Sequence, residues 1–184
     1  GSNLILDGGS QQTLSGGTGA SGMVDYTFND LTITNNSGSD PVTSPSVIFL
    51  HGFNVDNIFT VTTANVKIRF QEAENYRIAN GIDLNGQATG TRVALRSSTS
   101  GNPWILSVSG GPTTVYNVDA KDSDASGGVT IDASDTSNYD STGNTNWTFS
   151  SFTPSLTFAI SDNTIGFGNL SSGAARYATG DTLG

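Results

Sequence analysis

Short runs of strand-forming residues recur along this 184-residue chain, and they restrict it to all-β architectures. Runs such as residues 47–50, 66–70 and 104–108 are only four or five positions long. Glycine, asparagine, aspartate and serine stand between them, and these residues supply positive φ angles or local side-chain hydrogen bonds. The best helical candidate, residues 70–81, has irregular apolar spacing and runs directly into another strand-like segment. We therefore expect an all-β chain.

The strand runs alternate with a period of two. Residues 66–70 place three apolar side chains on one face and two cations on the other. Residues 26–34 alternate in the same way but slip by one position near their middle. Such a slip predicts a β-bulge or a corner at that point.

Two architectures fit short strands at close intervals, a β-solenoid and a β-sandwich. Two Asn-Gly pairs, at residues 80–81 and 85–86, lie too close together to be two hairpins, so they resemble the corners of one coil. Residues 76–97 and 113–134 also form a loose repeat of about 22 residues, each with a strand, a polar turn, a short strand and a glycine corner. The sequence therefore favours a parallel β-solenoid, with the β-sandwich as the alternative.

Composition narrows the partners and the location. The formal net charge is −9 with seven lysines and arginines, so a basic face for nucleic acid is not expected. No apolar run approaches the roughly 18 residues of a membrane span. There is no cysteine, hence no disulfide and no thiolate metal site. A cysteine-free, lysine-poor acidic chain rich in threonine, asparagine and glycine is typical of bacterial proteins that are extracellular or on the cell surface, and we expect that location.

The acidic tract of residues 119–124 is the one candidate metal site. Asp119, Asp122 and Asp124 are spaced like oxygen ligands for Ca²⁺. An EF-hand loop also needs a glycine and a distal glutamate, which are missing here, and Lys121 within the tract opposes a cation. A solvated turn is the better interpretation, so we expect no cofactor, with Ca²⁺ as the alternative.

Motifs for catalysis are not found in the sequence. The single histidine, His51, has no Gly-x-Ser-x-Gly nucleophile motif to serve. We therefore expect a protein that is not an enzyme. The alternative is a carbohydrate-binding or carbohydrate-cleaving protein, in which exposed aromatic rings stack on sugars. The candidate rings for glycan contact are Tyr76, Trp104, Tyr116 and Tyr139.

Three segments carry a resemblance to a known family. Residues 82–110, IDLNGQATGTRVALRSSTSGNPWILSVSG, are followed by VYNVDAKDSDASGGVTIDAS (115–134) and STGNTNWTF (141–149). This succession resembles the coils of right-handed parallel β-helix proteins of the pectate-lyase-like kind, which are bacterial secreted or surface proteins and include adhesin-like members. The resemblance implies a parallel β-helix closed by the Gly-Asn-x-x-Trp element of residues 143–147.

The β-helix interpretation assigns inward and capping positions. Trp147 and Phe149 are suited to cap the last coil, because an open solenoid end exposes apolar side chains and free backbone. The predicted inward row is Val93, Leu95, Ile105, Val108, Val115, Val118, Val129 and Ile131.

Residues 150–184 follow the predicted cap and begin with a Ser/Thr/Pro hinge. We expect residues 1–149 to form the β-helix domain and residues 150–184 to be a β-strand extension, either the start of a next domain or a segment that joins subunits. A lone hairpin is marginal in water, so its apolar faces need a partner. We expect an extracellular structural or adhesin-like subunit of a surface fibre, whose partners are copies of itself or adjoining domains of a larger surface protein. The predicted assembly residues are Leu156, Phe158, Ile160, Ile165 and Phe167.

Overall fold

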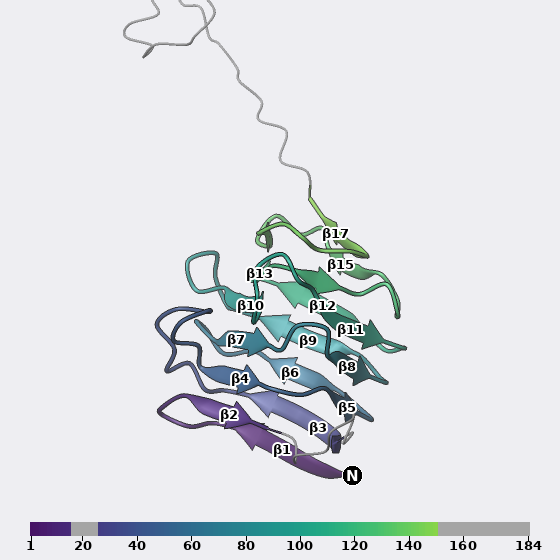
Figure 1. Cartoon of the computed structure of the whole chain (residues 1–184). Coiled ribbons are helices and arrows are strands. Elements are labelled where there is room, and N and C mark those ends of the chain that lie inside the picture. Colours follow the sequence, from purple (N-terminus) through teal and green to yellow (C-terminus); the bar gives the residue numbers. More distant parts are fainter. Residues whose placement is uncertain (16–25, 151–184) are drawn as a thin grey trace, which may run out of the picture. The chain divides into compact units, whose positions relative to one another are not determined.

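The computed structural model describes residues 1–15 and 26–150, which contain strands and no helix (Figure 1). Residues 70–81, the weak helical candidate, hold a turn and a strand instead. The strands are β1 (Ser2–Leu6), β2 (Gln12–Leu14), β3 (Tyr26–Ile33), β4 (Val47–Phe49), β5 (Phe53–Val55), β6 (Phe59–Val61), β7 (Lys67–Phe70), β8 (Asn75–Ile78), β9 (Ile82–Asn85), β10 (Val93–Ser97), β11 (Trp104–Val108), β12 (Thr113–Tyr116), β13 (Val118–Ala120), β14 (Ser123–Asp124), β15 (Ile131–Ala133), β16 (Tyr139–Asp140) and β17 (Trp147–Phe149).

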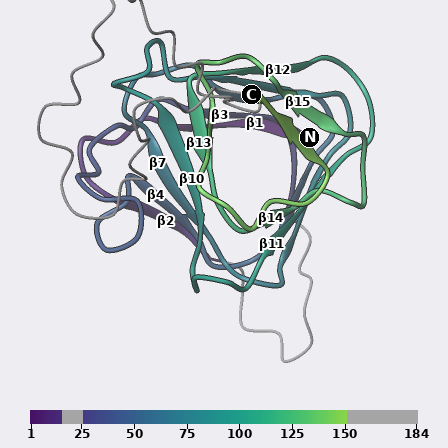
Figure 2. The same ribbon diagram turned by 90° about the horizontal axis from the view of Figure 1, so that it is seen from above.

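The strands pair in parallel with a regular offset. From β4 to β11, each strand is hydrogen-bonded to the strand three places later in the chain, and β13 pairs with β16 in the same way. The result is one sheet of nine strands, a second of six and a third of two, stacked from β1 and β2 at one end to β17 at the other (Figure 1). Viewed along the stack, the sheets surround a common interior (Figure 2). Among the described strands no pair is an antiparallel hairpin, which a β-sandwich would require.

The phase slip predicted in residues 26–34 lies where β3 changes partners. Tyr26–Phe28 pairs with β5, whereas Leu31 and Thr32 pair with β6. On its other side the register with β1 also shifts, between Ser2 and Leu4. A bulge or corner was expected at this point, and the structure confirms it.

The loose 22-residue repeat was aligned wrongly. Residues 76–97 cover β8 to β10, but residues 113–134 begin at β12, which is equivalent to β9. The two segments are therefore out of phase by one strand. Loops of unequal length separate equivalent strands. Tyr76 pairs with Leu106 whereas Leu95 pairs with Ala120, so paired residues are not a constant number of positions apart. A repeat of fixed length in the sequence therefore could not locate both pairs.

The inward row is partly as predicted. Val93, Leu95, Val108, Val115, Val118 and Ile131 are buried. Ile105 is only half-buried and Val129 is 41% exposed, so both assignments were wrong. Within β11, side chains alternate, and Val108 shares its face with Trp104 and Leu106 rather than with Ile105.

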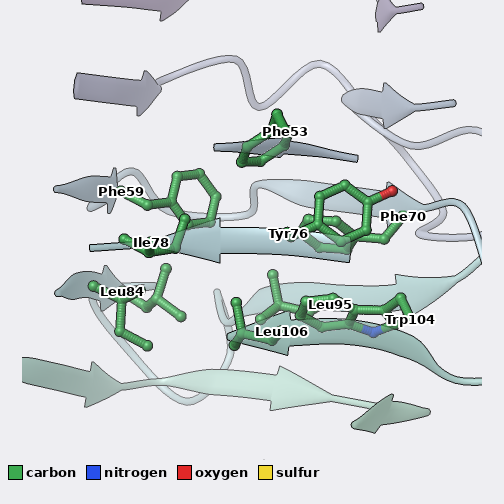
Figure 3. A pocket seen from close by; sticks show the side chains of 10 residues that line it. Phe53, Phe59, Phe70, Tyr76, Ile78, Leu84, Leu95, Trp104 and Leu106 are labelled. Carbon is green, nitrogen blue, oxygen red and sulfur yellow. The ribbon is translucent and has the colours of Figure 1, made fainter. Parts of the chain in front are cut away.

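Aromatic rings fill the middle of the core (Figure 3). Phe70 stacks on Trp104 with ring centroids 4.0 Å apart, and Tyr76 meets Phe53 and Phe70 edge-on at 5.0 and 4.9 Å. The void that remains among these side chains and their aliphatic neighbours is only about 10 Å³. The interior is therefore packed side chain against side chain.

Candidate functional site

The three aspartates proposed as Ca²⁺ ligands have separate partners. Asp119 forms an ion pair of 2.6 Å with Arg96 and accepts a hydrogen bond from the Ser141 hydroxyl. Asp122 is buried and accepts from the backbone N–H of Gly101, while Asp124 accepts from the backbone N–H of Ser126. In the described part of the chain, no three His, Asp or Glu side chains lie close enough together to hold a metal ion.

Asp124 and two aspartates that follow the tract form the same kind of turn. Asp124, Asp132 and Asp135 each accept a hydrogen bond from the backbone N–H of a serine two positions later. These are Asx turns, in which the carboxylate substitutes for a backbone acceptor. The serine hydroxyl and N–H hold the pKa of all three carboxyls below its ordinary value. The Asp-x-Ser spacing therefore marks where the chain turns.

Two of the four proposed glycan contacts are in the core. Tyr76 and Trp104 are 0% and 1% exposed, so neither ring has a free face for a sugar, and these two assignments were wrong. The Tyr76 hydroxyl accepts a hydrogen bond from the Gln71 N–H, and burial raises the pKa of Tyr76 well above its ordinary value. The Trp104 indole N–H donates to the carbonyl of Lys121 at 3.3 Å. Both polar groups are thus satisfied inside the protein.

The other two rings are exposed. Tyr139 is 56% exposed and lies under the Arg92 guanidinium at 5.7 Å, and Tyr116 is 46% exposed at the end of β12. Tyr116 lines an open depression of about 310 Å³. The other residues that line this depression are Thr113, Val115, Asp132, Ser134 and Asp135.

This depression lies where the parallel ladder is interrupted. β12 pairs with β9, and β15 pairs with β17, but β12 and β15 are not hydrogen-bonded to each other although they are in contact. The buried Asn138 side chain bridges the gap, because its amide donates to the carbonyls of Val115 and Ala133 and its oxygen accepts from the Val118 N–H.

The depression combines a partly exposed tyrosine with two carboxylates of lowered pKa and the side chain of Ser134. Sugars are recognised by such groups, since rings pack on C–H faces and carboxylates accept from sugar hydroxyls. Sequence reasoning selected Tyr116 but missed Asp132, Ser134 and Asp135. The available signal was the Asp-x-Ser turn directly after the strand of residues 131–133, yet nothing in the sequence placed it beside Tyr116.

The proposed capping residues lie at the end of the stack opposite β1 (Figure 1). Trp147 and Phe149 are half-buried, stack on each other at 5.8 Å and pack against the core. The Trp147 indole N–H donates to the hydroxyl of Ser123, and Asn144 donates to the carbonyl of Ala120. These contacts hold β17 over the preceding strands.

The predicted assembly residues and the whole extension from residue 151 lie outside the described residues. Among the residues that the structure does describe, no helix is long and apolar enough to cross a bilayer. Comparisons with family models, with curated proteins and with solved structures give no match for this chain. The family resemblance thus stays a prediction that rests on the quoted segments.

Proposed function

We propose that the chain is a right-handed parallel β-solenoid that serves as an extracellular structural or adhesin-like subunit of a bacterial surface fibre. The parallel pairing of each strand with the strand three places later carries this proposal. A chain that repeats this offset returns to the same sheets at every turn, as a solenoid does. Right-handedness follows from the strong preference of parallel crossover connections.

A scaffold role agrees with where the polar groups lie. Several described carboxylates have structural partners: Asp40 and Asp132 accept hydrogen bonds from nearby backbone N–H groups in turns, Glu74 accepts from the Gly52 N–H, and Asp119 forms an ion pair with Arg96. The core continues without a break from Leu6 to Ala133. We propose a role that is not enzymatic, needs no cofactor and involves neither nucleic acid nor a membrane span. The proposed partners are copies of the chain, or adjoining domains of a larger surface protein, joined through the terminal strands.

Removal of the extension tests this proposal. A chain that ends at Ser150 should stay monomeric at concentrations where the full chain assembles, because the joining strands are gone. Sedimentation velocity and electron microscopy of both chains measure the difference. Circular dichroism must show that the shortened chain keeps its β-structure. Equal assembly of the two chains would show that the extension does not join subunits.

A second function, glycan binding, is favoured by the depression beside Tyr116. The expected ligand is a neutral sugar that stacks on Tyr116 and donates hydroxyl groups to Asp132 and Asp135. Tyr116→Ala and Asp132→Asn should each abolish binding on a glycan array, whereas Tyr139→Ala, which removes an exposed tyrosine outside the depression, should not. Binding that survives both substitutions would exclude this site.

A further inference from the structure

Within the described residues, the first strand of the stack, β1, is paired along one edge only. β1 pairs with β3 along one side, and no described residue pairs with its other side. The strand, Ser-Asn-Leu-Ile-Leu, contains no charge and no proline, and Ile5 is 59% exposed. Native proteins usually protect edge strands with lysine, proline or a covering segment, since a bare apolar edge pairs with other chains. β1 therefore has the properties of an acceptor strand.

The interior at this end is incompletely covered. Leu4 on β1 and Leu14 on β2 are only partly buried, whereas Ile68 and Leu95 in the middle of the stack are 0% and 1% exposed. One more strand with apolar side chains facing inward would cover these leucines. Burial of apolar surface contributes about 25 cal/mol per Å², so the added strand would be held by more than its ladder hydrogen bonds.

We infer that residues 155–161 of one copy add as a parallel strand to the free edge of β1 in the next copy. Their sequence, Ser-Leu-Thr-Phe-Ala-Ile-Ser, alternates with Leu156, Phe158 and Ile160 on one face. That face covers Leu4 and Leu14, and the backbone completes the outer ladder of β1. This inference rests on the proposed assembly of copies and names the acceptor within it.

The short segment between Phe149 and Ser155 indicates that the β1 edge in question belongs to a neighbouring copy and not to the same chain. Five residues separate Phe149 from Ser155. The six Cα-to-Cα intervals from Phe149 to Ser155 span at most about 20–22 Å in a fully extended chain. Five spacings separate the six strands from β2 to β16, and at about 4.8 Å each they amount to about 24 Å. β17 lies at the end beyond them (Figure 1). Residues 155–161 thus cannot reach β1 of their own chain, but a copy stacked end to end presents β1 next to β17.

Disulfide trapping tests the pairing, because the chain has no cysteine of its own. Full chains with Ile5→Cys are mixed with full chains carrying Thr157→Cys and oxidised, and mass spectrometry identifies the linked peptides. The expected result is a mixed disulfide between the two chains. The matched control pairs Thr157→Cys with Thr60→Cys, which lies on the interior strand β6, and should give none. Equal linkage in both mixtures would overturn the inference.

A charge on the edge gives an independent readout. Ile5→Lys should raise the concentration needed for assembly at least about tenfold, because lysine blocks edge pairing. Val42→Lys, at an apolar residue outside β1 that is 43% exposed, should leave this concentration unchanged. If unsubstituted chains do not assemble, the proposed function fails. If they assemble but show neither the mixed disulfide nor sensitivity to Ile5→Lys, only this inference fails.

Discussion

At the scale of single residues, position in a strand decides what a side chain can do. Trp104 and Ile105 are neighbours in sequence, yet one is in the aromatic core and the other is half-buried. The same holds for the aspartates, because Asp122 is buried at a positive φ of 53° whereas Asp132 is exposed in an Asx turn. Residue type alone therefore does not tell whether an apolar side chain is in the core or at the surface. It also does not tell whether an aspartate is free to bind a ligand or is used in a turn.

Ser134→Ala should raise the pKa of Asp132 toward the ordinary value of about 3.9, because the serine hydroxyl is the largest cause of its lowering. A lowered pKa in the folded state contributes stability above the ordinary pKa, and this is lost as the pH falls through the folded value. NMR titration of the side-chain carboxyl carbon measures the change. Ser126→Ala is the control and should move the pKa of Asp124 alone; an unchanged pKa of Asp132 would contradict the assignment.

At the scale of elements, the interruption between β12 and β15 is the main irregularity of the described stack. Ladder hydrogen bonds are replaced there by one buried asparagine, and the sheet surface opens into the depression beside Tyr116. A stack of parallel strands can contain such a break only if the freed backbone groups find other partners. Asn138 supplies them.

Asn138→Ala should destabilise the fold by about 1–3 kcal/mol for each backbone group left unpaired, namely the Val118 N–H and the carbonyls of Val115 and Ala133. Urea unfolding measures the total, and hydrogen exchange should show the loss at Val118 first. Asn80→Ala, which removes an exposed bond to the carbonyl of Asp56, is the control and should cost less than about 1 kcal/mol. Similar costs for both variants would mean that Asn138 does not bridge the gap.

Gly111→Ala should be more destabilising than Gly101→Ala. Both glycines have positive φ, 70° and 86°, so either alanine costs about 1–2 kcal/mol of backbone strain. At Gly111 the new Cβ would also collide with the carbonyl of Asn80, whereas Gly101 has open space around it. Thermal unfolding of the two variants gives the comparison. Equal melting temperatures would show that the turn at Gly111 is loose.

At the scale of the whole molecule, one continuous core links the parallel sheets. Its centre is aromatic, and a chain of ring contacts links Phe49, Phe53, Phe70, Tyr76 and Trp104. These rings come from five different strands, so they couple successive turns of the chain. Loss of packing at this centre therefore affects the stack as a unit.

Alkaline pH should unfold the protein through Tyr76. Burial raises the pKa of Tyr76, so its contribution to stability is complete below the ordinary tyrosine pKa of about 10 and is lost as the pH rises above it. Phenolate absorbance of Tyr76, obtained as the difference between the protein and the Tyr76→Phe variant, should appear together with the loss of circular dichroism. Tyr76→Phe should move the unfolding transition to higher pH. Ionisation of Tyr76 with the β-structure intact would contradict the prediction.

The sequence predicted the local structure of single strands, but it did not predict which strands and side chains meet. Alternation predicted strands such as residues 66–70 and 104–108, and the phase slip in residues 26–34 predicted the irregularity of β3, because both depend on neighbouring positions only. The burial of Tyr76, the half-exposure of Ile105 and the meeting of Tyr116 with Asp132 depended on pairing between strands. Loops of unequal length set that pairing.

The sequence by itself determined an all-β chain with short strands, acidic turns and no cysteine chemistry, since strand period and turn residues act within a few positions. Only the tertiary structure decided that each strand pairs in parallel with the strand three places later and that the aspartates of the acidic tract have separate partners. It also decided that Tyr116 lies beside the interruption between β12 and β15 that Asn138 bridges. The physical reason is that parallel register joins residues about 20 to 30 positions apart, as Ala120 with Asp140 and Tyr76 with Leu106. No short-range pattern carries that information.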